Sequence, residues 1–510
     1  MNVELNNPSI INQTSSPLAS PSTLLCVFSF VAGLLVLSQS LFIDGSEHWF
    51  NTFAGVEFFL ILMFSTITTA LIEKTIIHPY IFLQGTLALF IGGRFLASPF
   101  LDAEIFSDDN YIPIELNYLE ASFLMSRVCG ALLMMHAGYL LIQVLHKNKR
   151  IEFPKDTALK GLVIPCLVLL SISTIISVYA IAQHYAACID LGYMAIYKDQ
   201  GTDNLLRLSS IGQYGLLLGA GLAFATSKRW LQMLAIALVT GYYVAYLGVG
   251  LRSGFLALVL MATWLAHTRL KRLNIITLIF VPIVMFGLAQ LSTTVGCRAS
   301  GGEAPVKETP ALTSKNADFK TPQQPTPLQR YRENLKLQQL AWFSYLQGST
   351  LVYTGAAMRI EDYPASAFLQ TFIPGYSQIA HILEPEKLNS DFYFPHYLAR
   401  SYSEEKYDEG FGMGWSIFSD LSAFSKGNAV LFALLSVILG AALAYLIKGI
   451  ETSAYLSGAL VCVFMKLMLL PRSGLYSVIP YLAVYTAIFL GWKLFMHLLR
   501  LMQKNGNHAI

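Results

Sequence analysis

The chain has 510 residues, of which 55% are hydrophobic and only 13% are charged. Globular domains carry about 25% charged residues, so this composition excludes a soluble enzyme and a disordered regulator. The formal net charge of +3 is too small to indicate a nucleic-acid partner. Six cysteines are too few for a disulfide scaffold in a chain of this length. A polytopic membrane protein is the class that remains.

Apolar runs close to the ~20 residues that a bilayer core requires recur along most of the chain. They predict an all-α membrane protein with twelve transmembrane helices, nine of them within 24–294 and three within 428–499. The predicted spans are 24–43, 52–72, 76–98, 119–145, 161–183, 207–227, 231–250, 253–268, 274–294, 428–448, 453–470 and 475–499. The run at 253–268 is short, and the run at 119–145 is long enough to tilt.

Lysine and arginine residues in the short connections set the predicted orientation, because cytoplasmic loops are enriched in them. They gather in three connections and at the C-terminal end, namely 146–160, 228–229, 269–272 and 493–504. With these segments in the cytoplasm, twelve spans predict cytoplasmic tails at 1–23 and 500–510. The opposite loops at 44–51 and 95–118 are acidic.

One large polar segment, 295–427, interrupts the spans, and the orientation makes it periplasmic. Its first part, 298–327, is rich in Pro, Ala, Lys and Thr and has few large apolar residues, so we expect disorder there. The part from 328 to 427 carries many aromatic residues. Apolar positions over 328–347 fall near helical spacing, which predicts an amphipathic helix on the membrane surface.

Positively charged residues occur at the outer ends of the predicted spans, where the inside preference disfavours them. The five arginines at this level are Arg94, Arg127, Arg207, Arg252 and Arg472, and Lys466 lies in the outer half of its span. Each arginine can form a structural ion pair with a nearby acid or reach the interface. The candidate acids are Glu57, Glu120, Asp190 and Asp203. Because guanidinium groups bind phosphate in a bidentate manner, five at one depth also predict a site for a lipid-linked pyrophosphate.

Four segments of the chain resemble bacterial O-antigen polymerases of the Wzy type. They are GVGLRSGFLALVLMATWLAHTRLKRL (248–273), TFIPGYSQIAHILEPEKLNSDFYF (371–394), DEGFGMGWSIFSDLSAFSKGNAVLFALLSVILG (408–440) and LLPRSGLYSVIPYL (469–482). The twelve-span plan with a large loop after the ninth span is similar too. The related O-antigen ligases share this architecture, so a ligase that transfers glycan to lipid A-core remains an alternative, and a lipid-linked oligosaccharide transporter is a further one.

The resemblance implies an inverting membrane glycosyltransferase of the GT-C kind in the bacterial inner membrane, with its active site facing the periplasm. Its substrates would be oligosaccharide repeat units linked to undecaprenyl pyrophosphate, used in O-antigen or capsule biosynthesis. A chain-length-determining co-polymerase of the Wzz type is an expected partner. No cofactor is expected, and we see no cluster of His, Cys or carboxylate residues at metal-ligand spacing.

Within this scheme the arginines would stabilise the leaving pyrophosphate. We rank Arg252 and Arg472 first, then Arg207 and Arg127, with Arg94 last. The general base must lie on the outer side, where the candidates are His184, Asp190, His381, His396, Glu404, Glu405, Asp408, Glu409 and Asp420. Among these, His396 lies among aromatic residues suited to stacking on sugars.

We therefore choose His396 ahead of Glu409, which neighbours two glycines, and assign Arg400 and Asp190 to the substrate loops. The doublet Asp108-Asp109 is interpreted as a solvated turn. Two cysteines on the outer side, Cys188 and Cys297, have the oxidising surroundings that a disulfide requires, but their spacing does not decide whether they pair.

Overall fold

The computed structural model describes residues 20–39, 47–101, 103–108, 112–148, 159–191, 203–226, 228–249, 252–270, 337–383 and 389–506. Over these ranges the chain is an all-α membrane protein with one short β-ladder. Seven of the described helices are long and apolar enough to cross a membrane. The seven segments are Pro21–Gln39, Phe53–Glu73, Tyr118–Lys147, Val163–Cys188, Arg229–Val249, Ala429–Glu451 and Leu475–Gln503.

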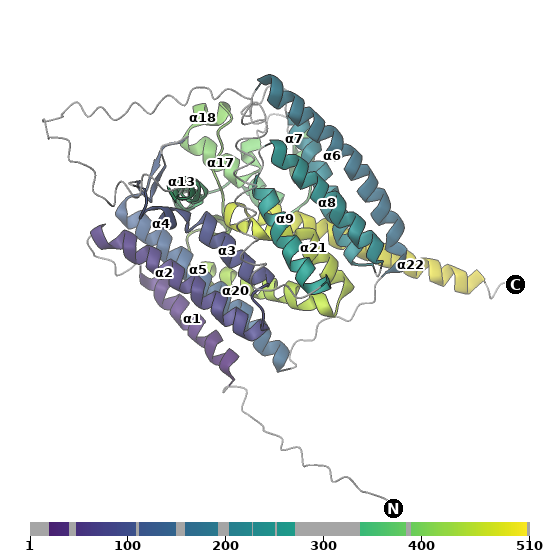
Figure 1. The fold of residues 1–510 in the computed structure, drawn as a ribbon, viewed down its shortest axis with the longest axis horizontal. Coiled ribbons are helices and arrows are strands. Elements are labelled where there is room, and N and C mark those ends of the chain that lie inside the picture. Colours follow the sequence, from purple (N-terminus) through teal and green to yellow (C-terminus); the bar gives the residue numbers. More distant parts are fainter. Residues whose placement is uncertain are drawn as a thin grey trace, which may run out of the picture.

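A first group of helices surrounds α5 (Tyr118–Lys147), which is buried along most of its length. The helices packed on it most extensively are α1 (Pro21–Gln39) and α20 (Ala429–Lys448), followed by α2 (Glu47–Glu73). Figure 1 shows this group on the left, with α1 outermost. The side chains of α1 that face away from α5, such as Leu24 and Leu35, are exposed, as expected for a lipid-facing helix.

Glycine allows α5 and α20 to approach closely. A Cβ atom on Gly138 would collide with the carbonyl oxygen of Val437, and a Cβ atom on Gly440 would collide with the carbonyl oxygen of Met135. Each helix thus places its backbone against a glycine of the other. Small residues at helix contacts have this role in membranes, because association there depends on close packing.

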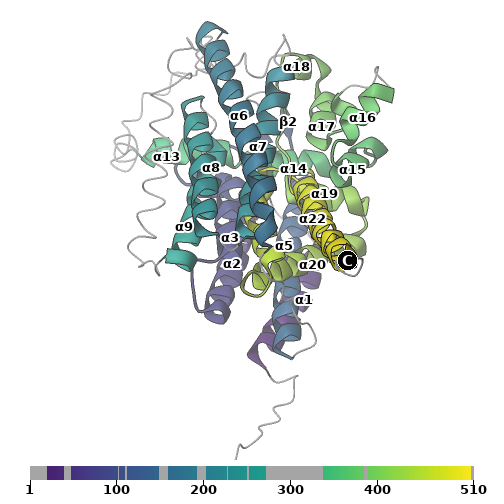
Figure 2. The same ribbon diagram turned by 90° about the vertical axis from the view of Figure 1, so that its right-hand side faces the viewer.

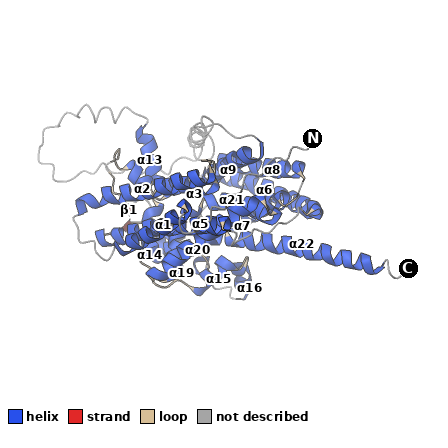
Figure 3. Cartoon of the chain, turned by 90° about the horizontal axis from the view of Figure 1, so that it is seen from below, coloured by secondary structure: helices blue, strands red, loops and turns tan. Residues whose placement is uncertain are grey.

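A second group of helices lies to the right in Figure 1. Its members are α6 (Val163–Leu191), α7 (Asp203–Phe224), α8 (Arg229–Val249), α9 (Arg252–Leu265), α21 (Ala454–Met468) and α22 (Ile479–Gly506). A π-helical segment, η4 (Ala266–Leu270), follows α9. Helix α7 is central here and packs mainly on α6 and α21. Figure 3 shows the C-terminal part of α22 extending beyond the other helices, where Leu494 and Met502 are exposed.

Short elements cover one end of the helices, which we call the loop end. They include α4 (Gly93–Ala97), β1 (Ser107–Asp108), β2 (Ile114–Glu115), α13 (Leu337–Gln347), α14 (Thr350–Met358), α15 (Ala365–Phe372), α16 (Tyr376–Leu383), η5 (Asn389–Asp391), α17 (Phe394–Tyr402), α18 (Glu404–Asp408) and α19 (Ile417–Ser425). The turns η7 (Leu470–Arg472) and η8 (Leu475–Ser477) follow α21 here. Figure 2 shows α15 to α18 gathered on one side of this end.

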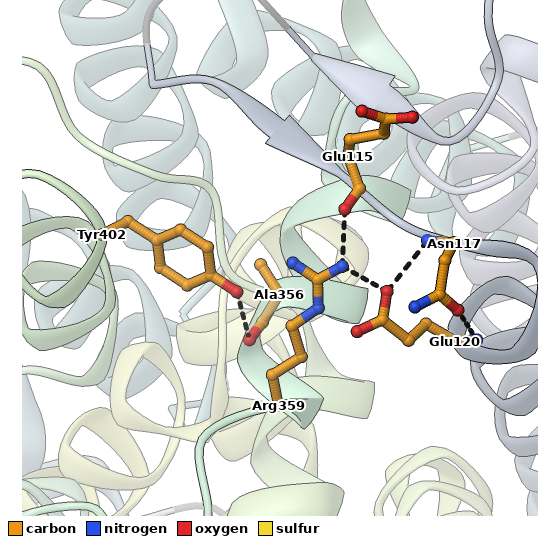
Figure 4. Close-up of polar contacts among 6 residues, drawn as sticks. All are labelled: Glu115, Asn117, Glu120, Ala356, Arg359 and Tyr402. Atoms are coloured by element: carbon orange, nitrogen blue, oxygen red, sulfur yellow. Dashed lines mark hydrogen bonds and ion pairs between the residues drawn. The ribbon is translucent and has the colours of Figure 1, made fainter.

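Polar contacts fasten these elements to the helices (Figure 4). A capping box begins α5, with Asn117 Oδ1 accepting from Glu120 N–H at 3.0 Å. The Glu120 carboxylate also forms an ion pair with Arg359, the residue that ends α14. Tyr402 of α17 donates to the Ala356 carbonyl oxygen at 3.3 Å. Glu120, one of the acids considered for the membrane arginines, is therefore occupied by an arginine of the large loop.

Most predicted spans coincide with helices, but some differ in extent. The run at 76–98 is divided between α3 (Pro79–Phe90) and α4, and the predicted surface helix at 328–347 is described only from Leu337. Two shorter elements, η2 (Lys160–Leu162) and η6 (Gly449–Glu451), occur beside span ends. The ninth span at 274–294 and the disorder expected at 298–327 lie outside the described residues. The number of twelve spans stays a prediction.

Candidate functional site

The helix directions bring the predicted arginine positions to the loop end. Lys466, near the end of α21, donates to Gln213 Oε1 in the middle of α7 at 2.9 Å. The end of α21 therefore lies beside the middle of α7, and the turn η7, which follows α21, contacts α3 and α19. Arg207 belongs to the first turns of α7 and Arg252 begins α9. The arginines are thus at one end of the bundle, although the side chain of Arg207 lies outside the described residues.

Arg94 is fully buried and has its own counter-ion. Its Nη2 lies 3.0 Å from Asp108 Oδ2, and Nη1 donates to the carbonyl oxygens of Ile105 (3.1 Å) and Ser107. The guanidinium also lies over the ring of Tyr345, 4.4 Å from its centroid. The structural ion pair therefore accounts for Arg94. The interpretation of Asp108 as a solvated acid is wrong, because this side chain is only 2% exposed and the arginine compensates its burial.

Arg127, by contrast, has no carboxylate partner in the part of the chain that the structure describes. Its Nη2 donates to the Gly427 carbonyl oxygen at 3.0 Å. The rings of Phe123 and Phe432 lie 4.8 Å and 5.1 Å from its guanidinium carbon. Its Nη1 is buried without a hydrogen-bond acceptor among the described residues. The loop end of α5 therefore carries a positive charge, and one N–H group of its guanidinium has no acceptor among the described residues.

Lys466 is a second cation of this kind, outside the ranked set of arginines. Apart from Gln213, the ammonium group lies 5.4 Å from the centroid of the Tyr481 ring. Gln213 in turn donates to the Tyr243 hydroxyl at 2.9 Å. Over the described ranges Lys466 forms no ion pair. The signal in the sequence was a single lysine within an apolar run, at the depth of the arginines.

Arg252 lies close to this tyrosine-lined region. The glycine two residues later, Gly254, packs so closely on the Tyr243 ring that a Cβ atom would lie 2.5 Å from one of its carbons. Through Tyr243 and Gln213, the start of α9 is connected to Lys466. Arg252 and Lys466 therefore border the same cluster of neutral polar groups on α7 and α8.

Arg472 belongs to a tight turn over residues 470–477, which we call the arginine turn. Its Nη1 donates to Gln347 Oε1 of α13 at 2.8 Å, and its guanidinium carbon lies 5.7 Å from the centroid of the Phe90 ring. Because Arg94 contacts Tyr345 of the same helix, α13 connects the two arginines. The turn is thus seated between α3, α13 and α19.

Asp420 binds the backbone of the arginine turn. This fully buried carboxylate accepts from Trp415 Nε1 at 2.8 Å and from the backbone N–H of Leu475. A Cβ atom on Gly474 would lie 2.5 Å from Asp420 Oδ2, so the turn requires glycine at this position. Burial raises the pKa of Asp420 to about 7, although the hydrogen bonds from Leu475 and Trp415 act to lower it.

Asp420 is among the base candidates that the sequence offers, but it is not one of the two preferred residues. The sequence feature that could have singled it out is its position among the apolar residues Ile417, Phe418 and Leu421. These residues belong to α19, which is mostly buried. An isolated carboxyl group in such surroundings that titrates near neutrality is typical of functional sites.

The residues chosen from the large loop lie at the surface. His396 is exposed, and its Nδ1 lies 3.1 Å from the Tyr407 hydroxyl. Glu409 forms an exposed ion pair with Lys406 at 2.8 Å. Arg400 pairs with Glu404 one helical turn later and donates to Ser390 Oγ at 3.3 Å. The side chain of Asp190 lies outside the described residues.

One aromatic chain links the loop to the arginine turn. Tyr393 lies edge-on to His396, with ring centroids 5.7 Å apart, and edge-on to Tyr476 at 6.4 Å. His396 is therefore one ring removed from the arginine turn, whereas Glu409 and Arg400 have no such connection among the contacts described. Which of them acts on substrate stays a prediction.

The remaining expectations concern disulfides and metals. Cys188 is disulfide-bonded, and Cys297 lies outside the described residues. Within those residues no three His, Cys, Asp or Glu side chains gather as a metal site would require.

The loop end thus combines two cations, Arg127 and Lys466, that have no carboxylate partner among the described residues with a buried acid, Asp420, whose pKa is raised to about 7. Such cations can bind an anion, and the acid can position the turn beside it. No family model, curated protein or solved structure matches the chain.

Proposed function

We propose that the chain is a metal-independent glycosyltransferase that polymerises oligosaccharide repeat units carried on undecaprenyl pyrophosphate. The reaction would take place at the periplasmic face of the bacterial inner membrane, in O-antigen or capsule biosynthesis. The proposal includes twelve spans of the GT-C kind, with the ninth at 274–294. It rests on the resemblance of four segments to Wzy-type polymerases and on the charges at the loop end.

The observation that carries the proposal is that some buried or half-buried cations have a carboxylate partner and others have none among the described residues. Arg94 is matched by Asp108, and Lys448, at the opposite end of the bundle, is matched by Glu73 at 2.7 Å. Arg127 and Lys466 have only carbonyl, amide and ring partners among the described residues. An intramembrane charge without a counter-ion is costly and indicates an anionic ligand. A lipid-linked pyrophosphate has its charge at the bilayer edge and its tail in the hydrocarbon, which suits this location.

The reaction would be a single displacement. A hydroxyl oxygen of the acceptor repeat unit attacks the anomeric carbon of the donor glycan, and the bond from that carbon to the pyrophosphate oxygen breaks. The electron pair leaves with undecaprenyl pyrophosphate, the hydroxyl proton passes to a base, and the anomeric configuration inverts. Guanidinium and ammonium groups that are already in place stabilise the charge that develops on the leaving group.

The residues have distinct roles in this scheme. Arg252, Arg472, Arg127 and Lys466 hold the pyrophosphate, and Arg207 of α7 is a further predicted ligand. His396 serves as the base, and its neighbour Tyr393 offers a ring on which a sugar can stack. Asp420 is a positioning residue, because it binds the backbone of the arginine turn and not the ligand.

A deletion strain tests the proposal and its nearest alternatives. Loss of a polymerase leaves the lipopolysaccharide or capsule anchor with one repeat unit, so the ladder on a gel collapses to a single band. Loss of a ligase leaves an anchor with none, and loss of a transporter leaves lipid-linked units on the cytoplasmic side. A ladder that the deletion leaves unchanged contradicts all three.

A matched pair of variants then tests the anion site. Arg252→Lys keeps the charge but removes the bidentate donor pair, and we expect it to reduce polymerisation at least tenfold when supplied on a plasmid. Arg500→Lys, in the exposed C-terminal part of α22, is the control and should restore the full ladder. Full activity of Arg252→Lys would refute a bidentate contact with pyrophosphate.

A further inference from the structure

A long stretch at the loop end that includes α15 and α16 has no charged residue. From Tyr363 to Leu383 the sequence has no Asp, Glu, Lys or Arg, and it is bounded by Asp362 and Glu384. The stretch includes α15 and α16, joined by Pro374 and by Gly375, whose φ of +76° favours glycine. Because Pro374 and Gly375 divide the stretch into two helices of 8 residues each, neither helix can span a bilayer, which is typical of an interfacial or re-entrant segment.

Helices α15 and α16 together form a hairpin whose outer face is apolar. Six large apolar side chains on it are exposed: Leu369, Phe372, Ile373, Ile379, Ile382 and Leu383. Ile382 and Leu383 are 79% and 75% exposed, as much as Val430 at the start of the transmembrane helix α20, at 79%. Soluble surfaces rarely gather this much apolar area without a partner.

The inner face of the hairpin is polar and well satisfied. Gln370 of α15 accepts from the Ser377 backbone N–H at 2.6 Å and donates to the Tyr393 hydroxyl at 3.3 Å. Ser377 Oγ lies 3.1 Å from the same hydroxyl. These hydrogen bonds fix the hairpin to Tyr393 and leave its apolar face on the outside. The hairpin is therefore amphipathic, with one polar face and one apolar face.

The apolar face continues the lipid-facing surface of the bundle. Helix α15 contacts α22 and the turn η8, and Phe372 packs on Phe424 of α19 with ring centroids 5.6 Å apart. Figure 2 shows α15 and α16 beside α19, next to the upper part of α22. Because α22 exposes Leu490 and Leu494 along a span that meets lipid, a bilayer around the bundle would also reach the hairpin.

We propose that the α15–α16 hairpin lies in the bilayer interface, with its six apolar side chains in the boundary between headgroups and acyl chains of the leaflet at the loop end. The occupant of the apolar face is lipid, not a second protein, because the face is continuous with transmembrane helices. The interaction is mainly apolar burial, since the stretch carries no Asp, Glu, Lys or Arg.

Spin labels on single cysteines test the inference in vesicles of phosphatidylcholine and phosphatidylglycerol. Ile382→Cys and Leu383→Cys replace exposed side chains, so the fold should persist, and Asp362→Cys, at a side chain 88% exposed, is the matched control in the same loop. We expect labels at 382 and 383 to collide several-fold more with oxygen than with a water-soluble nickel complex, and the label at 362 to show the reverse. High salt should change neither ratio.

Two outcomes would overturn the inference. Nickel accessibility at 382 equal to that at 362 places the hairpin in water. Labels at 382 and 383 that are immobile and shielded from both reagents indicate a protein partner or a second copy of the chain. Labelling of the chain without an added cysteine provides the background, because Cys26, Cys129, Cys166 and Cys462 are free but buried or partly buried. The measurement needs no catalytic activity, so its failure is distinct from failure of the proposed function.

Discussion

At the scale of single residues, Arg127 and Arg94 have opposite consequences for stability. Arg127 has no described counter-ion, so Arg127→Met removes a buried charge and should leave the thermal midpoint unchanged or raise it. We expect the same variant to abolish polymerisation. Arg94→Met leaves the buried Asp108 unpaired, which should cost about 3–5 kcal/mol of the free energy of unfolding.

Thermal unfolding in detergent, followed beside the lipopolysaccharide ladder, separates the two cases. If Arg127 were only structural, its replacement would lower the thermal midpoint as much as that of Arg94 does. A stable but inactive Arg127→Met variant would instead assign the guanidinium to ligand binding.

Asp420 gives the chain a predicted dependence on pH. Its pKa in the folded state, about 7, exceeds the value of about 3.9 expected in an unfolded chain. Between these values the folded state binds more protons, so stability falls as pH rises and reaches its lower plateau above pH 7. We expect the thermal midpoint to decrease from pH 5 to pH 8, and Asp420→Asn to remove this dependence. An unaltered slope in Asp420→Asn would assign the titration to another group.

At the scale of elements, the contact between α5 and α20 depends on glycine. Gly440→Ala places a methyl group against the carbonyl oxygen of Met135, and overpacking of this kind costs about 1–3 kcal/mol or more. Gly241→Ala in α8 is the matched control, because a Cβ atom there meets nothing within 4 Å and alanine favours a helix by about 1 kcal/mol. We expect thermal midpoints that move in opposite directions. Equal shifts would mean that helix propensity, not packing, dominates at Gly440.

Elements were also what could be predicted best from the sequence. Apolar runs predicted α1, α2, α5, α20 and α22 closely, because a long helix in lipid has one strong compositional signal. The division between α3 and α4 could not be predicted, since Gly92 and Gly93 are compatible with an unbroken helix as well. Gly93 is close to the Ser344 carbonyl oxygen and the backbone of Gly348, a contact between segments far apart in the chain.

At the scale of the whole molecule, the sequence predicted the depth of the arginines in the membrane but not the residues that contact them. The depth of Arg94, Arg127 and Arg472 follows from counting residues along helices. That Asp108 would neutralise one of them, and that Asp420 would hold the turn of another, depends on tertiary packing between distant segments. Hydrophobic pattern carries no such pairing information, which is why the contacts of Lys466 and Asp420, although both residues were candidates from the sequence, could be found only in the structure.

The orientation of the whole bundle supports the last prediction. Lys147, Lys228 and Arg229 lie at helix ends opposite the loop end, and the inside preference of such residues puts the loop end outside. In spheroplasts, a membrane-impermeant maleimide should label Asp362→Cys directly, whereas Lys228→Cys should react only after permeabilisation. The reverse pattern would put the cations of the loop end in the cytoplasm. Repeat units flipped to the periplasmic leaflet could not reach them there, so polymerisation at this site would be excluded whatever the arginine variants showed.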